Sequence, residues 1–230
     1  MDHPTPDWLA LLRARTDTFA DLVRGADLEA PVTHCPDWTV HDLVAHLGGV
    51  HEWAAHAVVA GDPDLSPEQP SATDSRELAE WYADRAAHLL DVLTRTPSDA
   101  PAWTLDRDDR TPGFWRRRQV HETAMHVWDL EEALGQPRPI DPWLAWDGVL
   151  EVVDVLHPHQ LRLGRTQPPA EAVRLVATDT PGDVVLGDDE GDPVVVRDRA
   201  EVLLRLLWHR ADRAGLDPRA AALLSAAVTP

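Results

Sequence analysis

The chain has 230 residues, of which 43% are hydrophobic and 27% are charged, and this composition is typical of a globular protein whose core is large enough to fold without disulfide bonds. Its single cysteine, Cys35, excludes an internal disulfide framework and a cysteine-rich zinc site, so a metal would need histidine and carboxylate ligands. The formal net charge of −19 disfavours binding to nucleic acids and to anionic membrane surfaces, and small molecules are therefore the expected partners.

Residue usage and the N-terminal segment indicate the source and the location of the protein. Lysine and asparagine are absent, all 21 basic residues are arginine, and Ile140 is the only isoleucine. Because these residue types have A/T-rich codons, the bias indicates a GC-rich genome such as that of an actinobacterium. No apolar run reaches the length of about 18 residues that a transmembrane helix needs, and the first residues lack the basic and apolar regions of a signal peptide. We therefore expect a cytoplasmic protein.

Four helices are expected in the first part of the chain. Asp7 is a suitable N-cap for the first helix and Gly25 a suitable stop, while Asp37 or Thr39 can cap the second. The third and fourth helices are joined by an irregular connection in which Trp103 is the obvious anchor. Apolar residues at helical spacing predict these helices at about residues 8–24, 40–60, 78–96 and 115–135.

The second expected helix carries His41, His46, His51 and His56 at intervals of five residues. A step of five residues turns about 140° around a helix, so the four side chains point in four directions and cannot form one cluster. His46 and His51 flank the apolar stripe of this helix, whereas the other two lie on its solvated face. Only His46 and His51 can therefore reach a site between helices.

The fourth expected helix carries a polar stripe formed by Glu122, His126 and Asp129. At about 100° per residue, Asp129 lies about 20° to one side of Glu122 and His126 about 40° to the other. The preceding His121 lies five residues from His126, about 140° around the helix, so this segment is not the HExxH motif of metalloproteases. Stripes of this kind are usually solvated surface, and a site needs a partner from another helix.

His46 is the partner that a helical bundle would provide. Opposite Glu122 and His126 it completes a set of two imidazoles and one carboxylate, which is typical of a zinc site whose fourth position is open for catalysis. Asp129 would hold a nitrogen of a histidine ligand.

The pattern changes after Gly135, where the proline-rich segment QPRPIDP indicates a linker. Beyond it we expect a helix over 143–156, short strands over 172–177, 183–186 and 193–196, and a final amphipathic helix over 199–213. The sequence therefore predicts an α+β protein of two domains, an all-helical domain over 1–137 and a small α+β domain over 138–230.

Four segments, DLVAHLGG, AWTL, FWRRRQVHETAMHVWD and LLWHR, resemble the mycothiol-dependent maleylpyruvate isomerase family. The resemblance implies an N-terminal DinB-like four-helix bundle and a C-terminal α+β domain of sterol-carrier-like shape. It also implies a divalent metal, usually zinc, held by His46, Glu122 and His126, with mycothiol as the thiol cofactor. The family uses an arginine of its C-terminal domain near the active site, and Arg210 in LLWHR is the closest match.

These features favour a mycothiol-dependent metalloenzyme in which the metal activates the thiol to attack a small electrophile. The outcome would be S-transfer or the cis–trans isomerisation of a maleylpyruvate-like acid, with Arg210 orienting an anionic group of the substrate. One alternative is a metal-dependent hydrolase that uses a metal-bound water, with Asp129 or His51 as the base. Another is a non-catalytic protein that binds a metal or a small ligand.

Overall fold

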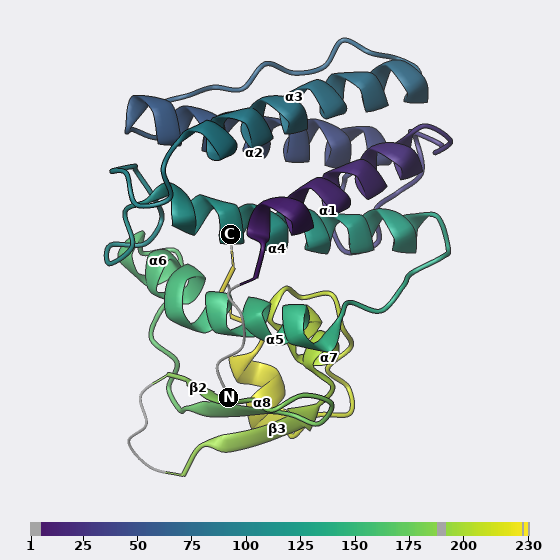
Figure 1. The fold of residues 1–230 in the computed structure, drawn as a ribbon. Helices are drawn as coiled ribbons and strands as arrows, with labels where there is room; N and C mark the ends of the chain where they lie inside the picture. The colour runs from purple at the N-terminus through teal and green to yellow at the C-terminus, as the bar shows by residue number, and fades with distance from the viewer. Residues whose placement is uncertain (1–5, 188–191, 227, 230) are drawn as a thin grey trace. The chain divides into compact units, whose positions relative to one another are not determined.

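The protein divides into two compact units, Met1–Arg138 and Pro139–Pro230, as the computed structural model in Figure 1 shows. The structure describes residues 6–187, 192–226, 228 and 229. Among these residues, no helix combines the length and the apolar character that crossing a membrane requires.

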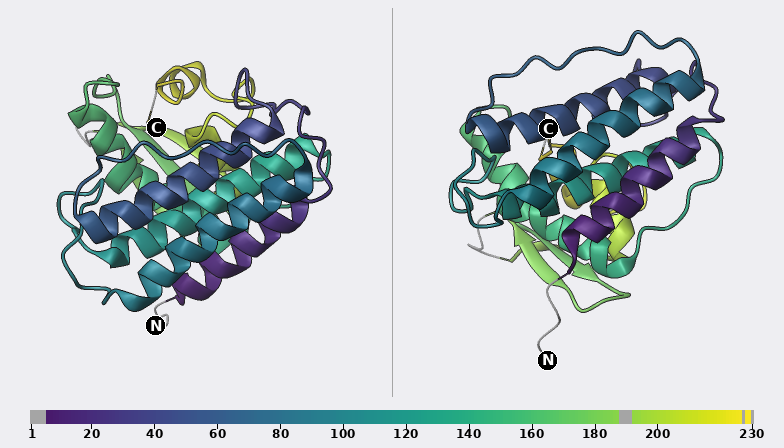
Figure 2. Two further views of the ribbon diagram at one scale, coloured as in Figure 1. Left: turned by 90° about the horizontal axis from the view of Figure 1, so that it is seen from above. Right: turned by 45° about the horizontal axis from the view of Figure 1, so that its top comes forward.

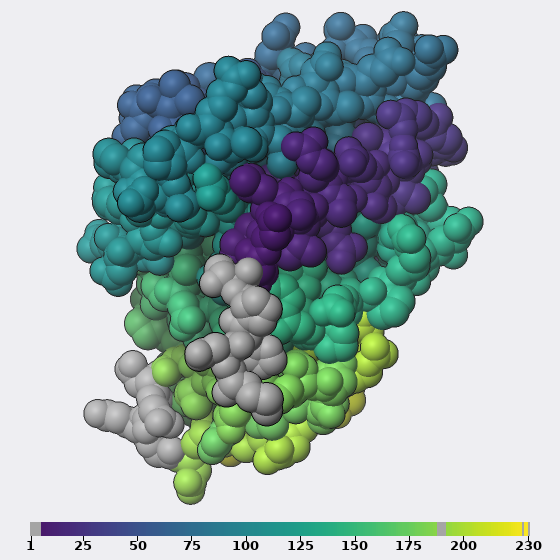
Figure 3. Space-filling view, in the orientation of Figure 1, coloured from purple at the N-terminus to yellow at the C-terminus, as the bar shows by residue number. Residues whose placement is uncertain are grey.

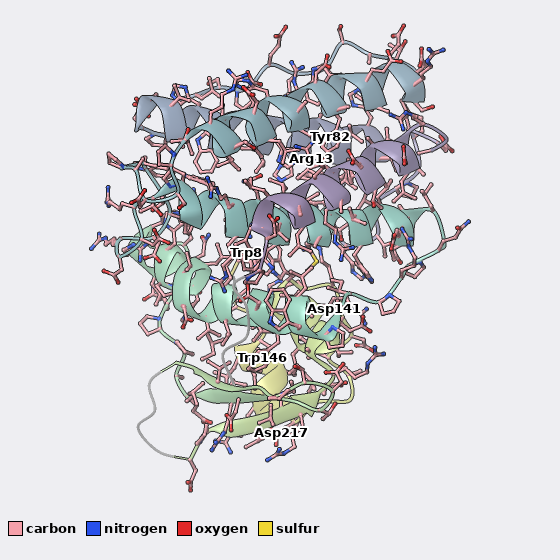
Figure 4. The ribbon with its side chains drawn as sticks, viewed as in Figure 1. Trp8, Arg13, Tyr82, Asp141, Trp146 and Asp217 are labelled. Carbon is pink, nitrogen blue, oxygen red and sulfur yellow. The ribbon has the colours of Figure 1, made fainter. Side chains whose placement is uncertain are left out.

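The first unit consists of long helices that surround one core. They are α1 (Trp8–Val23), α2 (Val40–Ala60), α3 (Ser75–Arg95) and α4 (Pro112–Ala133). Helices α1 and α2 each pack against both α3 and α4 (Figures 1 and 2). Side chains fill the space between the ribbons, and atoms of α1 and α3 lie in contact in Figure 3. Core side chains with no exposed surface include Phe19, Leu43, Leu47, Tyr82 and Leu130; Figure 4 labels Tyr82 on α3.

The helix ends follow from local hydrogen bonds. The Asp7 side chain accepts a hydrogen bond from the Ala10 amide, and Thr39 forms a reciprocal capping box with Asp42 at the start of α2. These two starts confirm the predicted caps. Helix α4 ends in a Schellman motif around Gly135, whose positive φ of 72° suits glycine because it has no side chain.

The second unit combines helices with a small sheet. Helix α5 (Pro142–Glu151) continues through a π-helical turn, η1 (Val152–Leu156), into α6 (His157–Arg162). The sheet has the order β2-β1-β3, with β1 (Val173–Ala177) antiparallel to β2 (Asp183–Leu186) and parallel to β3 (Val194–Asp198). Helix α7 (Ala200–Leu207) packs against α5, β1 and β3, and α8 (Pro218–Leu223) packs against β3. The predicted mixture of helices with a small sheet is confirmed.

The structure differs most from the predicted helix bounds at two helix ends. The predicted final helix over 199–213 ends at Leu207, because His209 adopts a left-handed conformation with φ 59° and a Schellman motif forms around it. The predicted helix over 143–156 instead continues to Arg162. Residues 152–156 form a π-helical turn that joins α5 to α6 without a break.

Candidate metal centre

Three side chains from two helices meet inside the first unit. His46 of α2 and Glu122 and His126 of α4 each offer a ligand atom, and these three atoms lie within 4.8 Å of one another. The Glu122 Oε1 atom is 3.5 Å from His46 Nε2 and 3.3 Å from His126 Nε2. The His46 side chain is 37% exposed, whereas the other two are buried, so the cluster is accessible from the His46 side.

Small residues and aromatic rings set the position of His46. A Cβ atom on Gly48 would lie 2.3 Å from the Trp81 ring, and one on Gly49 would lie 3.2 Å from Pro67. The two glycines therefore let α3 and the α2–α3 connection approach α2 closely. The imidazole of His46 packs against the Trp38 ring, with 4.8 Å between the ring centroids.

Glu122 is held as a carboxylate by a buried arginine. Arg118, one turn earlier on α4, donates to Glu122 Oε2, which leaves Oε1 facing the two histidines. Burial alone raises the pKa of the Glu122 carboxyl, but Arg118 and the two histidines outweigh burial and hold that pKa well below its ordinary value. Sequence reasoning missed Arg118, although its spacing of four residues from Glu122 was the available signal.

Asp129 sets the proton arrangement of His126. Its Oδ2 atom lies 2.9 Å from His126 Nδ1, and because a carboxylate only accepts hydrogen bonds, Nδ1 carries the proton and donates it. Nε2 then points a lone pair at Glu122 Oε1 unless it is also protonated. Burial lowers the pKa of His126, but hydrogen bonds to Asp129 and Glu122 outweigh burial, so that the pKa is raised. The gap between Nε2 and Oε1 therefore favours a positive charge.

A divalent metal fits this gap. Zinc bonds of about 2.0–2.2 Å in tetrahedral geometry separate neighbouring ligand atoms by about 3.3–3.6 Å. The separations of 3.5 and 3.3 Å from Glu122 Oε1 to the two Nε2 atoms agree with this spacing. Two imidazoles and one carboxylate form a donor set that suits zinc.

His51 and His121 do not join the cluster. His51 is fully buried, with Nδ1 2.8 Å from Gln119 Oε1 and Nε2 3.1 Å from the Tyr82 hydroxyl. Burial lowers the pKa of His51 to about 4, although the hydrogen bond to Gln119 acts in the opposite direction. His121 packs against the Trp8 ring with 5.9 Å between centroids.

Arg210 lies in the second unit, directly after α7. The Schellman motif that ends this helix joins the Arg210 amide to the Arg205 carbonyl at 2.6 Å and the His209 amide to the Leu206 carbonyl at 3.2 Å. The Arg210 side chain is buried; its Nη1 donates to the Trp208 carbonyl at 2.6 Å, and its guanidinium lies over the Trp208 ring. The turn around His209 therefore fixes the position of Arg210 within this unit.

A pocket opens beside His46. Its volume is about 230 Å³ and it lies entirely within the first unit. The lining residues come from α2 and from the connection between α2 and α3, and they are Ala45, His46, Gly49, Val50, Trp53, Pro67 and Gln69.

Comparisons with known proteins find relatives in sequence and in fold. Two uncharacterized proteins of Mycobacterium tuberculosis, from strains CDC 1551 / Oshkosh and ATCC 25618 / H37Rv, are each 29% identical over 136 residues, which cover 56% of this chain and 68% of the relative. A crystal structure of the mycothiol-dependent maleylpyruvate isomerase is 16% identical, with a TM-score of 0.64 over 92% of both chains. A histidine-to-alanine mutant of that enzyme gives a TM-score of 0.65 over 91% of both chains. At this identity, the likeness shows that the fold is shared.

The sequence of the helical unit matches a family model. The model, described as the mycothiol maleylpyruvate isomerase N-terminal domain, matches residues 9–131, which include most of α1–α4 and all three clustered side chains. This chain therefore belongs to the mycothiol maleylpyruvate isomerase N-terminal domain family.

Proposed function

We propose that this protein is a mycothiol-dependent metalloenzyme in which His46, Glu122 and His126 hold a divalent metal, zinc by the nature of the donor set. The observation that carries the proposal is the arrangement of these three ligand atoms, with Arg118 on one side of Glu122 and Asp129 behind His126. The family of the chain supports the choice of mycothiol, because the solved relative of the same fold is a mycothiol-dependent isomerase.

The chemistry follows from the charge that the site would carry. When bound, zinc lowers the pKa of a thiol so that the nucleophilic thiolate forms near neutral pH. Asp129 keeps the proton of His126 on Nδ1, which leaves the lone pair of Nε2 available to bind a metal. Arg118 keeps Glu122 ionised and engages the oxygen that does not face the histidines. Arg210 has the role of binding an anionic group of the substrate, as the family resemblance predicts.

The thiolate can complete either of two reactions. In an isomerisation, its sulfur adds to a carbon of a cis double bond, the resulting single bond rotates, and elimination restores the double bond and returns the thiol unchanged. In an S-transfer, the new carbon–sulfur bond is retained, the neighbouring carbon takes up the proton that the thiol released, and the thiol is consumed. Both reactions suit a small electrophile such as a maleylpyruvate-like acid.

We also propose that the first unit is a DinB-like four-helix bundle over 1–137 and that the second, over 138–230, is related in shape to sterol-carrier folds. The shared fold of the solved isomerase, which matches 92% of the chain, supports this assignment.

Metal analysis of variants tests the ligand set. We expect about one equivalent of zinc in the wild-type protein and in His41→Ala, a control on the same helix outside the cluster, and much less in His46→Ala and Glu122→Gln. A full equivalent of zinc in both ligand variants would show that the metal is held elsewhere.

Turnover assays with the zinc-loaded protein test the reaction. Mycothiol and a panel of electrophiles should give thiol loss for S-transfer, or thiol-stimulated isomerisation without thiol loss. Turnover without any thiol would favour the hydrolase, and zinc binding without turnover on the panel would favour a binding protein. For Arg210→Ala, we expect retained zinc and an increased KM for anionic electrophiles, and unchanged kinetics would remove Arg210 from the site.

A further inference from the structure

The pocket beside His46 has a chemical character that selects between the two reactants of the proposed reaction. We propose that it binds the uncharged sugar portion of mycothiol rather than the electrophile. This inference rests on the proposed function, because it assigns one part of the thiol cosubstrate to a surface of the same site. Mycothiol joins its cysteine to glucosamine and inositol, two rings whose polar groups are hydroxyls and a neutral amide.

The aromatic wall of the pocket is rigid. The indole nitrogen of Trp53 donates to the Pro63 carbonyl at 2.9 Å, which ties α2 to the connection that follows it. The Trp53 ring packs against Trp103 and Trp115, with centroids 5.5 and 5.2 Å away. A fixed aromatic surface suits the apolar C–H face of a sugar ring, because little side-chain freedom is lost on binding.

Another part of the lining comes from the α2–α3 connection. This connection runs back over α2 and α3 (Figure 2) and contacts α2 where Pro67 packs against Gly49. Gln69 contributes an amide that both donates and accepts hydrogen bonds. It can therefore pair with a sugar hydroxyl, which also donates and accepts. Trp53, Pro67 and Gln69 therefore offer an apolar face and a polar edge to one ring.

The charge around the pocket disfavours an anion. None of the seven lining residues is an arginine or a lysine, and His46 is neutral when it binds a metal. The connection that covers the pocket, residues 61–74, contains acidic residues and no basic residue; the acidic residues are Asp62, Asp64, Glu68 and Asp74. A carboxylate of an acidic electrophile would be repelled here, whereas an uncharged polyol would not.

The size of the pocket agrees with a partial ligand. At about 230 Å³ it lies below the range of about 300–1,000 Å³ that is typical of sites for whole drug-sized ligands. It therefore has room for one ring of the cosubstrate, next to His46.

Binding of a thiol-free fragment tests the assignment without turnover. N-acetylglucosaminyl-inositol, which keeps the neutral amide but carries acetyl in place of the cysteine and so cannot bind metal through sulfur, is titrated by calorimetry into the zinc-loaded wild-type protein and into Gln69→Ala. We expect the Kd to rise about three- to tenfold in the variant, as the loss of one hydrogen bond implies. Gln69 is exposed, so its replacement leaves the core intact, and the adjacent exposed Glu68, which does not line the pocket, provides Glu68→Gln as the matched control.

Kinetics separate this inference from the proposed function. Gln69→Ala should raise the KM for mycothiol by the same factor, but it should leave unchanged the KM for the electrophile and the KM for N-acetylcysteine used in place of mycothiol. An increased KM for the electrophile instead, or equal fragment binding by both proteins, would overturn the assignment of the pocket while thiol-dependent turnover remained. If the zinc-loaded wild-type protein showed no thiol-dependent turnover at all, the proposed function itself would be overturned.

Discussion

Asp129 determines which nitrogen of His126 is available as a ligand atom. Its carboxylate oxygen lies 2.9 Å from His126 Nδ1 and is buried together with the imidazole. An asparagine can still accept this hydrogen bond through its carbonyl oxygen, but it lacks the negative charge that makes the imidazole a stronger ligand. We therefore expect Asp129→Asn to weaken zinc binding about 10- to 100-fold, measured by competition with a chelator of known affinity.

Asp84 provides the control for this measurement, because it is exposed on α3 outside the cluster. Asp84→Asn should keep the wild-type zinc affinity. If Asp129→Asn also kept it, with helix content unchanged by circular dichroism, Asp129 would have no part in tuning the site.

His51 makes the stability of the protein depend on pH. Burial lowers its pKa in the folded protein to about 4 from an ordinary value of 6.5. Between these two values the unfolded chain binds a proton that the folded protein does not, so stability falls as the pH falls through this window and is fully retained above it. The contribution is about 3 kcal/mol in the free energy of unfolding.

His51→Gln removes the titrating group while it keeps a polar side chain. The variant should lose less stability than the wild-type protein between pH 6.5 and 4, measured by urea unfolding of metal-free protein. The comparison uses the change with pH, so a constant loss of stability from the substitution does not affect it. Equal losses in both proteins would mean that His51 titrates in the folded state as it does in the unfolded chain.

Helical spacing reduced the candidate histidines of α2 to two, and the choice of His46 over His51 needed the further assumption that α2 faces α4 in a bundle. Helical spacing removed His41 and His56 from any site between helices, and it left His46 and His51 on either side of the apolar stripe. The residues that distinguish them come from other helices, namely Glu122 beside His46, and Gln119 and Tyr82 around His51. Which partner each histidine meets depends on helix packing, which spacing along one helix does not contain.

At the scale of the elements, the start of α3 depends on a single side chain. Asp74 accepts hydrogen bonds from the amides of Arg76 and Glu77, two of the donors that a helix start leaves without a partner. We expect Asp74→Ala to reduce the free energy of unfolding by about 0.5–2 kcal/mol, and Asp74→Ser to restore most of it because serine also caps helices. Urea unfolding at neutral pH measures both values, and equal stability of Asp74→Ala and Asp74→Ser would contradict the role of the cap.

Element types were more predictable than element ends. The long helices and the three strands follow from apolar spacing and from Asp/Gly turns, because these patterns reflect burial on one face. The end of α7 was missed because His209 takes the left-handed position that glycine usually occupies. The residue type at position 209 therefore gave no signal that the helix ends. The left-handed conformation of His209 is stabilised by a contact from elsewhere in the chain, because its Nε2 atom lies 3.0 Å from the Ala226 carbonyl.

At the scale of the whole molecule, the family resemblance predicted more than periodicity could. Spacing indicated two units and a polar stripe on α4, but a stripe of this kind is usually solvated. The wheels of the two helices and the geometry of a bundle placed His46 opposite Glu122 and His126, and the family resemblance implied the same three ligands. In the structure, α2 packs against α4 and the three side chains meet, as that pairing requires.

Metal binding should therefore stabilise the fold. The ligand atoms converge only when α2 and α4 are packed, so the unfolded chain holds zinc more weakly than the folded protein does. Free zinc at about 100 times its Kd should raise the free energy of unfolding by about 2.7 kcal/mol, and the gain should grow with the logarithm of the zinc concentration.

Glu122→Gln should lose most of this gain in stability from zinc, whereas His41→Ala should keep it, as measured by thermal unfolding with and without a chelator. Because protons compete for the imidazoles, the gain should also shrink as the pH is lowered. A gain of equal size in Glu122→Gln would place the stabilising metal outside this cluster, since a site that lacks its carboxylate cannot distinguish the folded chain from the unfolded one as strongly.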